Sequence, residues 1–101
     1  MSEPIYKVWL VKGKAPYYEL TPEEQNKLSK KAGEALAKVG GETVIACNTG
    51  WCSENWQLWG VEKFPDIEAV QKHTDLLLEL NWFHYVESTS YLGTKLPENW
   101  R

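Results

Sequence analysis

Residues 56–73, WQLWGVEKFPDIEAVQKH, join two patterns that together decide the fold. The first part, residues 56–63, is rich in aromatic and apolar side chains and predicts a strand. The triplet FPD at 64–66 interrupts that pattern and opens a helix. The helix is predicted because the positions of one largely apolar face then recur at helical spacing, at Ile67, Val70, Thr74 and Leu77. A strand therefore runs directly into an amphipathic helix.

The N-terminal part of the chain predicts the same order, a strand and then a helix. β-branched and aromatic side chains come in near alternation along residues 5–12, which predicts a first strand. Its two faces carry Tyr6, Val8 and Leu10 on one side and Ile5, Lys7, Trp9 and Val11 on the other. The sequence TPEE at 21–24 combines an N-cap threonine, a proline at the first helical position and a capping-box glutamate. A helix over residues 22–39 follows, and a Gly-Gly pair ends it.

Two further strands complete the pattern. Residues 42–48 predict a strand that pairs with residues 56–63 as a hairpin, and residues 83–91 predict a last strand. The order strand, helix, strand, strand, helix, strand predicts one α+β domain over residues 1–101, with ferredoxin-like βαββαβ topology. In this topology a four-stranded antiparallel sheet carries both helices on one face.

Strand alternation also predicts an assembly. We expect the helices to cover Val8, Leu10 and Val61. The opposite face would then expose the apolar residues Ile5, Trp9, Val11, Trp56 and Leu58. An exposed apolar patch of this size is typical of an interface. A second copy packed sheet to sheet would cover it, so we expect a homodimer that encloses an apolar space.

The composition excludes several kinds of partner. The chain is 43% apolar and 25% charged, which is typical of a globular protein. Its net charge of -3, without a cluster of basic residues, predicts binding neither to nucleic acid nor to an anionic membrane surface. The start of the chain lacks a signal-peptide cleavage site, and no apolar run approaches the roughly 18 residues of a membrane span. We therefore expect a cytoplasmic protein.

The two cysteines, Cys47 and Cys52, have no second pair that would complete a zinc site, so no metal site is expected. In a reducing cytosol two free thiols are the default, and a disulfide across one turn is the alternative.

Three stretches resemble the dimeric α+β barrel superfamily, and they are most similar to a small uncharacterised branch of it. They are LTPEEQNKLSKKAGEAL at 20–36, WQLWGVEKFPDIEAVQKH at 56–73 and NWFHYVES at 81–88. The resemblance implies a pocket between the concave face of the sheet and the helices, which usually hosts an aromatic or polyketide-like molecule. It also implies cofactor-independent proton transfer of the cyclase, isomerase or monooxygenase type. In haem-handling members a histidine on or near the second helix often ligates iron, and His73 lies in that region.

Four side chains are candidates for catalysis. His73 and His84 are acid or base candidates because histidine titrates near neutral pH. Glu62, expected on the face away from the helices, would be a carboxyl with a pKa raised by desolvation, and Tyr85 an orienting hydroxyl. Structural roles are the alternatives: solvated or backbone-bonded histidines, and an ion pair between Glu62 and Lys7. A slip of one residue in the last strand would exchange His84 for Tyr85 in the cavity.

Aromatic, apolar and acidic side chains would form the wall that contacts the substrate. The candidates are Trp9, Tyr17, Trp56, Leu58, Glu87 and Tyr91. Aromatic residues also fill cores and interfaces, which is the structural alternative. Three functions therefore stay open: a protein that binds a hydrophobic metabolite and transforms it without a cofactor, a non-catalytic binding or structural dimer, and a haem-binding protein.

Overall fold

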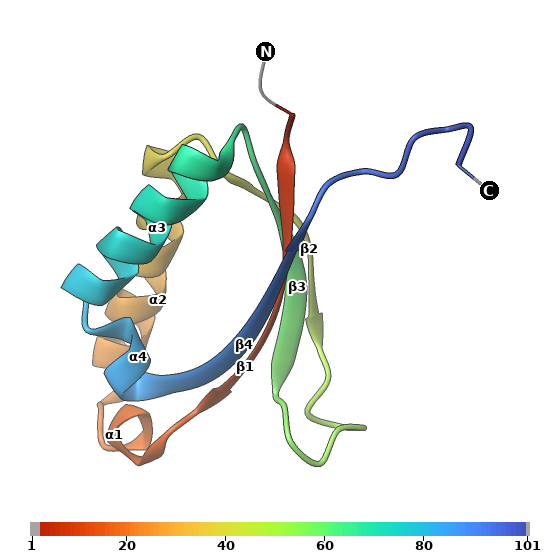
Figure 1. Ribbon diagram of the computed structural model, residues 1–101. Helices are drawn as coiled ribbons and strands as arrows, with labels where there is room; N and C mark the ends of the chain where they lie inside the picture. The colour runs from red at the N-terminus through yellow and green to blue at the C-terminus, as the bar shows by residue number, and fades with distance from the viewer. Residues whose placement is uncertain (1–2, 101) are drawn as a thin grey trace.

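The computed structural model describes residues 3–100 and contains one antiparallel sheet. The strands are β1 (Ile5–Gly13), β2 (Glu42–Asn48), β3 (Leu58–Phe64) and β4 (Val86–Gly93). They lie in the order β2-β3-β1-β4, so the first and last strands of the chain are neighbours. The long helices are α2 (Pro22–Lys38) and α3 (Ile67–Glu79), and the one-turn helices are α1 (Ala15–Tyr18) and α4 (Trp82–Tyr85). Figure 1 shows α2 and α3 side by side on one face of the sheet, which confirms the predicted βαββαβ fold.

Side-chain caps start both long helices at the residues that the sequence indicates. Thr21 Oγ1 accepts a hydrogen bond from the Glu24 backbone N–H at 3.1 Å, and the Glu24 carboxylate accepts one from Thr21 N–H at 2.8 Å. The Asp66 carboxylate accepts a hydrogen bond from Ala69 N–H at 2.8 Å at the start of α3. Each cap satisfies amide groups that the helix itself leaves unpaired.

The core lies where β3 passes into α3. Phe64 is fully buried, and it packs in a cluster with Leu36 of α2 and with Ala69 and Val70 of α3. Ile5 of β1 packs against the same cluster. This contact fixes both helices against the sheet, and it leaves space farther along the sheet for a cavity.

The helices cover the opposite face from the one predicted. Ile5 packs into the core and Trp9 and Val11 line a cavity under the helices, whereas Val8 is 38% exposed on the outer face. The prediction was wrong because both faces of β1 are apolar, so alternation alone cannot choose between them. The covered face also holds Lys7, a residue type that is seldom buried.

The last strand also differs from the prediction. β4 begins at Val86, and the preceding residues 82–85 form α4, so His84 and Tyr85 lie in a helical turn. Asn81 adopts a left-handed backbone conformation (φ 59°) between α3 and α4, which asparagine tolerates better than most residues. Alternation could not reveal this turn because it spans only four residues. Similarly, β3 begins at Leu58, so Trp56 precedes the strand.

An apolar row crosses the outer face of the sheet. The strand registers align Tyr91, Val8, Val61 and Ile45 across β4, β1, β3 and β2. Tyr91 is 65% exposed and Ile45 is 48% exposed. We call these four residues the outer row. Figure 1 shows that, among the described residues, no helix covers the outer face of the sheet.

Cys47 and Cys52 are both free thiols. Among residues 3–100, none of the helices combines the length and the apolar character needed to cross a bilayer.

Candidate functional site

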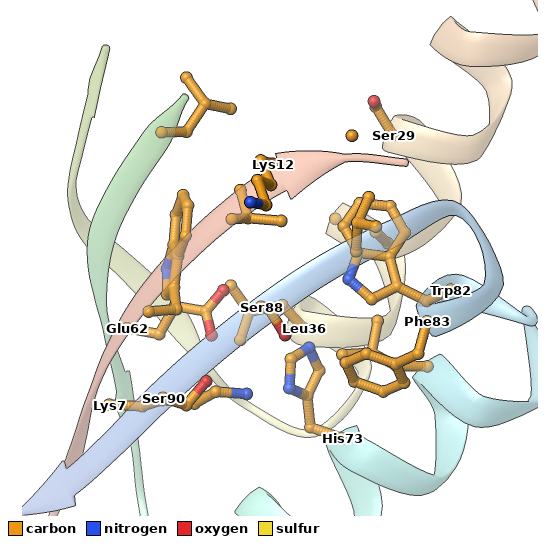
Figure 2. Close-up of a pocket in the computed structure, with 18 of the residues that line it drawn as sticks. Lys7, Lys12, Ser29, Leu36, Glu62, His73, Trp82, Phe83, Ser88 and Ser90 are labelled. Carbon is orange, nitrogen blue, oxygen red and sulfur yellow. The ribbon is translucent and has the colours of Figure 1, made fainter. Parts of the chain in front are cut away.

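A cavity of about 350 Å³ lies between the inner face of the sheet and the helices. Its size falls within the range of small-molecule sites in proteins. Apolar side chains make up most of its wall: Trp9, Val11, Leu36, Leu58, Leu77, Trp82, Phe83 and Val86. Figure 2 shows the side chains of Trp82 and Phe83 facing the sheet across this space. The cavity lies in the position that the family resemblance implies.

Three ionisable side chains from three elements meet in this apolar space. Lys7 of β1 and Glu62 of β3 are directly opposite each other in the strand register. His73 reaches the cavity from α3, and Figure 2 shows its ring beside the end of the Lys7 side chain. Lys7 is only 9% exposed and His73 only 3% exposed. Charged groups this deeply buried are rare unless they are paired.

Burial shifts the pKa values of Glu62 and His73 so that each group favours its neutral form. It raises the pKa of Glu62, an effect that the positive charge of Lys7 partly opposes. It lowers the pKa of His73 to about 4, and the charge of Lys7 acts in the same direction. His73 is therefore a neutral imidazole at pH 7, with one N–H donor and one acceptor nitrogen.

The same burial acts on the lysine. It lowers the pKa of Lys7 below the ordinary 10.5, while the neighbouring Glu62 carboxyl works against this shift. Burial thus shifts Lys7, Glu62 and His73 toward neutrality, in a cavity where each could exchange a proton with a bound molecule.

Two polar atoms at the cavity lack partners within residues 3–100: Trp9 Nε1 and His73 Nδ1 are buried without a hydrogen bond. The indole of Trp9 lies over Gly60, its partner on β3. A Cβ atom at position 60 would come within 2.5 Å of the Trp9 ring and 2.6 Å of the Ile45 carbonyl oxygen. Gly60 therefore makes room for the indole. Buried polar atoms are normally hydrogen-bonded, so these two indicate a place for water or a ligand.

The structure brings together about half of the candidate residues. Those that line the cavity are Trp9, Tyr17, Leu58, Glu62 and His73. Glu62 was expected on the face away from the helices, and this placement was wrong, because β1 and β3 both present the other face to the helices. The strand register pairs Glu62 with Lys7, but within residues 3–100 the ion pair between them that was the structural alternative is not formed. The catalytic and binding roles of these residues stay predictions.

The other five candidates lie away from the cavity lining. The exposed His84 ring packs edge-on against Tyr85, with 4.9 Å between ring centroids. Glu87 forms an ion pair with Lys12 at 3.8 Å, and the Lys12 amine lies 5.6 Å from the ring centre of Trp56. Tyr91 belongs to the outer row.

Sequence reasoning treated Lys7 only as an ion-pair partner and missed the contribution of the last strand and of α4. Ser88 and Ser90 line the cavity because they share the face of the buried Val86. Alternation from Val86 could have identified both serines. Trp82 and Phe83 reach the cavity through the α4 turn, which left no periodic signal.

The fold and the cavity define a ferredoxin-like α+β protein with a pocket between its sheet and its helices. No protein-family model and no curated protein matches the sequence. Solved structures match the fold at low identity. RPA0582 of Rhodopseudomonas palustris, described as a protein of unknown function, has a TM-score of 0.69 and 19% identity over 96% of this chain and 85% of that chain. The structure of its methylated form has a TM-score of 0.66 and 16% identity, over 98% of this chain and 85% of that chain.

A haem-binding protein from Thermus thermophilus also matches, with a TM-score of 0.72 and 19% identity over 97% of this chain. The present chain spans only 42% of that protein's length. These similarities establish the shared fold.

Proposed function

We propose that the cavity binds a small planar carbonyl or phenolic compound and that its ionisable groups move a proton to or from that compound. The observation that carries this proposal is the meeting of Glu62 and His73 in one apolar cavity. Their surroundings raise the pKa of Glu62 and lower the pKa of His73. Pairs of groups separated in this way are typical of acid and base assignments in enzymes.

The two groups suit different roles. A carboxylate with a raised pKa is a stronger base than an ordinary one, so Glu62 would accept the proton from an acidic C–H or O–H group. The neutral imidazole of His73 would donate a hydrogen bond to the oxygen on which negative charge develops. Trp9, Trp82 and Phe83 would hold the flat face of the compound.

Proton exchange with solvent tests this function without knowledge of the product. In D2O, a panel of small aromatic ketones would be followed by ¹H NMR for loss of the signal of the C–H next to the carbonyl. We expect Glu62→Gln to slow exchange by about 10²- to 10⁴-fold, the usual contribution of a general base. His73→Gln should also slow it. The exposed His84 provides the matched control, and His84→Gln should leave exchange unchanged.

Two results would contradict the proposal in different ways. Binding of the panel compounds, seen as amide shifts in ¹H–¹⁵N spectra, without any exchange would indicate a non-catalytic binding protein. Neither binding nor exchange across the panel would overturn the proposal as a whole.

Haem binding is a second candidate. It is favoured by His73 Nδ1, which has no hydrogen-bond partner in the described part of the chain, and by the haem-binding protein of similar fold. A histidine nitrogen is a common axial ligand of haem iron. Haem would supply a redox-active iron to the cavity, and His73 is the residue that would hold it. Addition of haem should then produce a shifted Soret band that His73→Gln abolishes and His84→Gln preserves. An unshifted band with the unaltered protein would exclude this candidate.

We also propose that a second copy of the chain covers the outer row. The row is apolar, and Val8 is at its centre, between Tyr91 on β4 and Val61 on β3. Val8→Glu would place two carboxylates near each other in a symmetric dimer. We expect the substitution to weaken dimerisation by about 100-fold or more, because like charges at an interface cost several kcal/mol. Analytical ultracentrifugation over a concentration series measures this effect.

Val44 provides a matched control, because it is also an exposed strand valine (54%) but lies at the irregular register of β2, outside the outer row. Val44→Glu should leave the dimer intact. A monomeric unaltered protein at micromolar concentration would contradict the dimer.

A further inference from the structure

We propose that Lys7 is an amine nucleophile that captures a carbonyl compound in the cavity as a Schiff base. This inference rests on the proposed function, because it names a covalent route by which the same cavity would activate its substrate.

The position of Lys7 is unusual for a lysine. It lies in the middle of β1, on the face that the helices cover, and its side chain is 9% exposed. Within residues 3–100, no ion pair or hydrogen bond holds its amino group; the ion pair of β1 is made by Lys12, with Glu87. Figure 2 shows the Lys7 side chain extending toward His73, among the residues that line the cavity.

A buried ammonium without a close partner is unfavourable, because it loses its hydration and gains little in return. Burial accordingly lowers the pKa of Lys7 and favours the neutral amine. The neutral amine has the free electron pair that attacks a carbonyl carbon, and desolvation in an apolar pocket is an established way to activate lysine.

The neighbours of Lys7 supply the proton transfers that this reaction needs. Glu62 lies opposite Lys7 on β3, and His73 reaches the same cavity from α3. Ser90 of β4 and the apolar Leu36 of α2 also line the cavity. Glu62, with its raised pKa, can hold a proton and release it. The neutral His73 can accept a proton from nitrogen and return it to oxygen.

The bond changes balance with these groups alone. Lys7 Nζ attacks the carbonyl carbon and forms a C–N bond, while the C=O π electrons move to oxygen. His73 carries one proton from the nitrogen to that oxygen, which gives a carbinolamine. The Glu62 carboxyl then protonates the hydroxyl, the C–O bond breaks, water leaves, and the nitrogen electron pair forms the iminium. One amine, one carbonyl and one proton therefore give one iminium and one water.

The product connects this step with proton transfer. Loss of its proton leaves Glu62 as a carboxylate opposite the positively charged iminium nitrogen, where opposite charges attract. The iminium also acidifies the C–H on the neighbouring carbon. The Glu62 carboxylate can then accept that proton, which leaves the bound compound as an enamine. This step is a proton transfer of the kind that the proposed function describes.

Reductive trapping tests the inference directly. The full chain would be incubated at pH 7 with limiting benzaldehyde and cyanoborohydride, and the modified lysine would be located by peptide mass spectrometry. We expect modification of Lys7 to be at least tenfold faster than that of any exposed lysine. Lys7→Arg keeps a long nitrogen-bearing side chain but has no amine nucleophile, so it should abolish trapping at this position. Lys31→Arg, an exposed position on α2, should leave trapping at Lys7 unchanged.

The outcomes separate this inference from the proposed function. Equal labelling of the exposed lysines with none at Lys7 would overturn the inference, since a buried amine that does not react is not a nucleophile. If the ketone panel still exchanged protons in D2O, the proposed function would stand without a covalent step. Trapping at Lys7 without any proton exchange would support the amine chemistry and contradict proton transfer. The mapping uses the unaltered protein, so the result does not depend on the folding of a variant.

Discussion

Phe64→Ala is expected to lower the free energy of unfolding by about 3–5 kcal/mol, the range measured for large-to-small changes at aromatic core positions. Phe64 is fully buried where β3 meets α3, and it packs against residues of both long helices. Removal of the ring would leave a cavity that its neighbours cannot fill without moving. Because the free energy of unfolding of small domains is only about 5–15 kcal/mol, this substitution would remove a large part of the protein's stability.

Chemical denaturation followed by tryptophan fluorescence measures the effect, at one protein concentration throughout. Phe83 is the matched control, since it is 36% exposed and lies outside the core cluster. Phe83→Ala should lower the free energy of unfolding by much less than Phe64→Ala. Phe64→Leu keeps most of the volume and should fall between the unaltered protein and Phe64→Ala. Equal losses for the two alanine variants would mean that the helices are not held at Phe64.

The contribution of His73 to the free energy of unfolding should fall by about 3 kcal/mol as the pH is lowered from about 6.5 to 4. The cause is His73, whose pKa is about 4 in the folded protein against an ordinary value of 6.5. In this range the unfolded chain binds a proton at His73 and the folded protein does not. Protons therefore favour unfolding, and the stabilising contribution is present above pH 6.5 and lost toward pH 4.

Comparison with His73→Gln isolates this effect. Glu62 has the opposite effect on the free energy of unfolding and raises it as the pH falls. The reason is that its raised pKa makes the folded protein bind a proton more readily than the unfolded chain. Both forms contain Glu62, so the difference in free energy of unfolding between them, measured by urea denaturation at each pH, reports on His73. That difference should shrink as the pH falls. His84→Gln should behave like the unaltered protein. A pH-independent difference between the unaltered protein and His73→Gln would show that His73 is not desolvated in the folded state.

The element order and the helix starts could be predicted because they depend on local signals. Thr21 and Glu24 form the expected capping box, and Asp66 caps α3. The covered face could not be predicted, since it depends on which of two apolar faces of β1 meets the helices. The choice puts Trp9 and Lys7 inside and Val8 outside.

The site was partly predictable for the same reasons. Helical spacing put His73 next to the inner face of α3, and the structure places it in the cavity. The strand reading of residues 83–91 failed at its start, because Asn81 in the left-handed conformation begins a helical turn that carries His84 outward. The importance of Lys7 could not be predicted, since its burial depends on the face choice and on the packing of α3 over β1.

Trp9 Nε1 and His73 Nδ1, which have no partner among residues 3–100, bear on how much of this protein a cell would contain. Phenylalanine and leucine at these positions would avoid the cost of two buried unsatisfied polar atoms, so the two polar side chains make the protein less stable than its fold allows. Under the proposed function, a bound compound restores part of that stability in proportion to the logarithm of its concentration. Proteases remove the unfolded form, and modest changes in stability alter abundance several-fold. The amount of the protein in the cell would then follow the supply of its ligand.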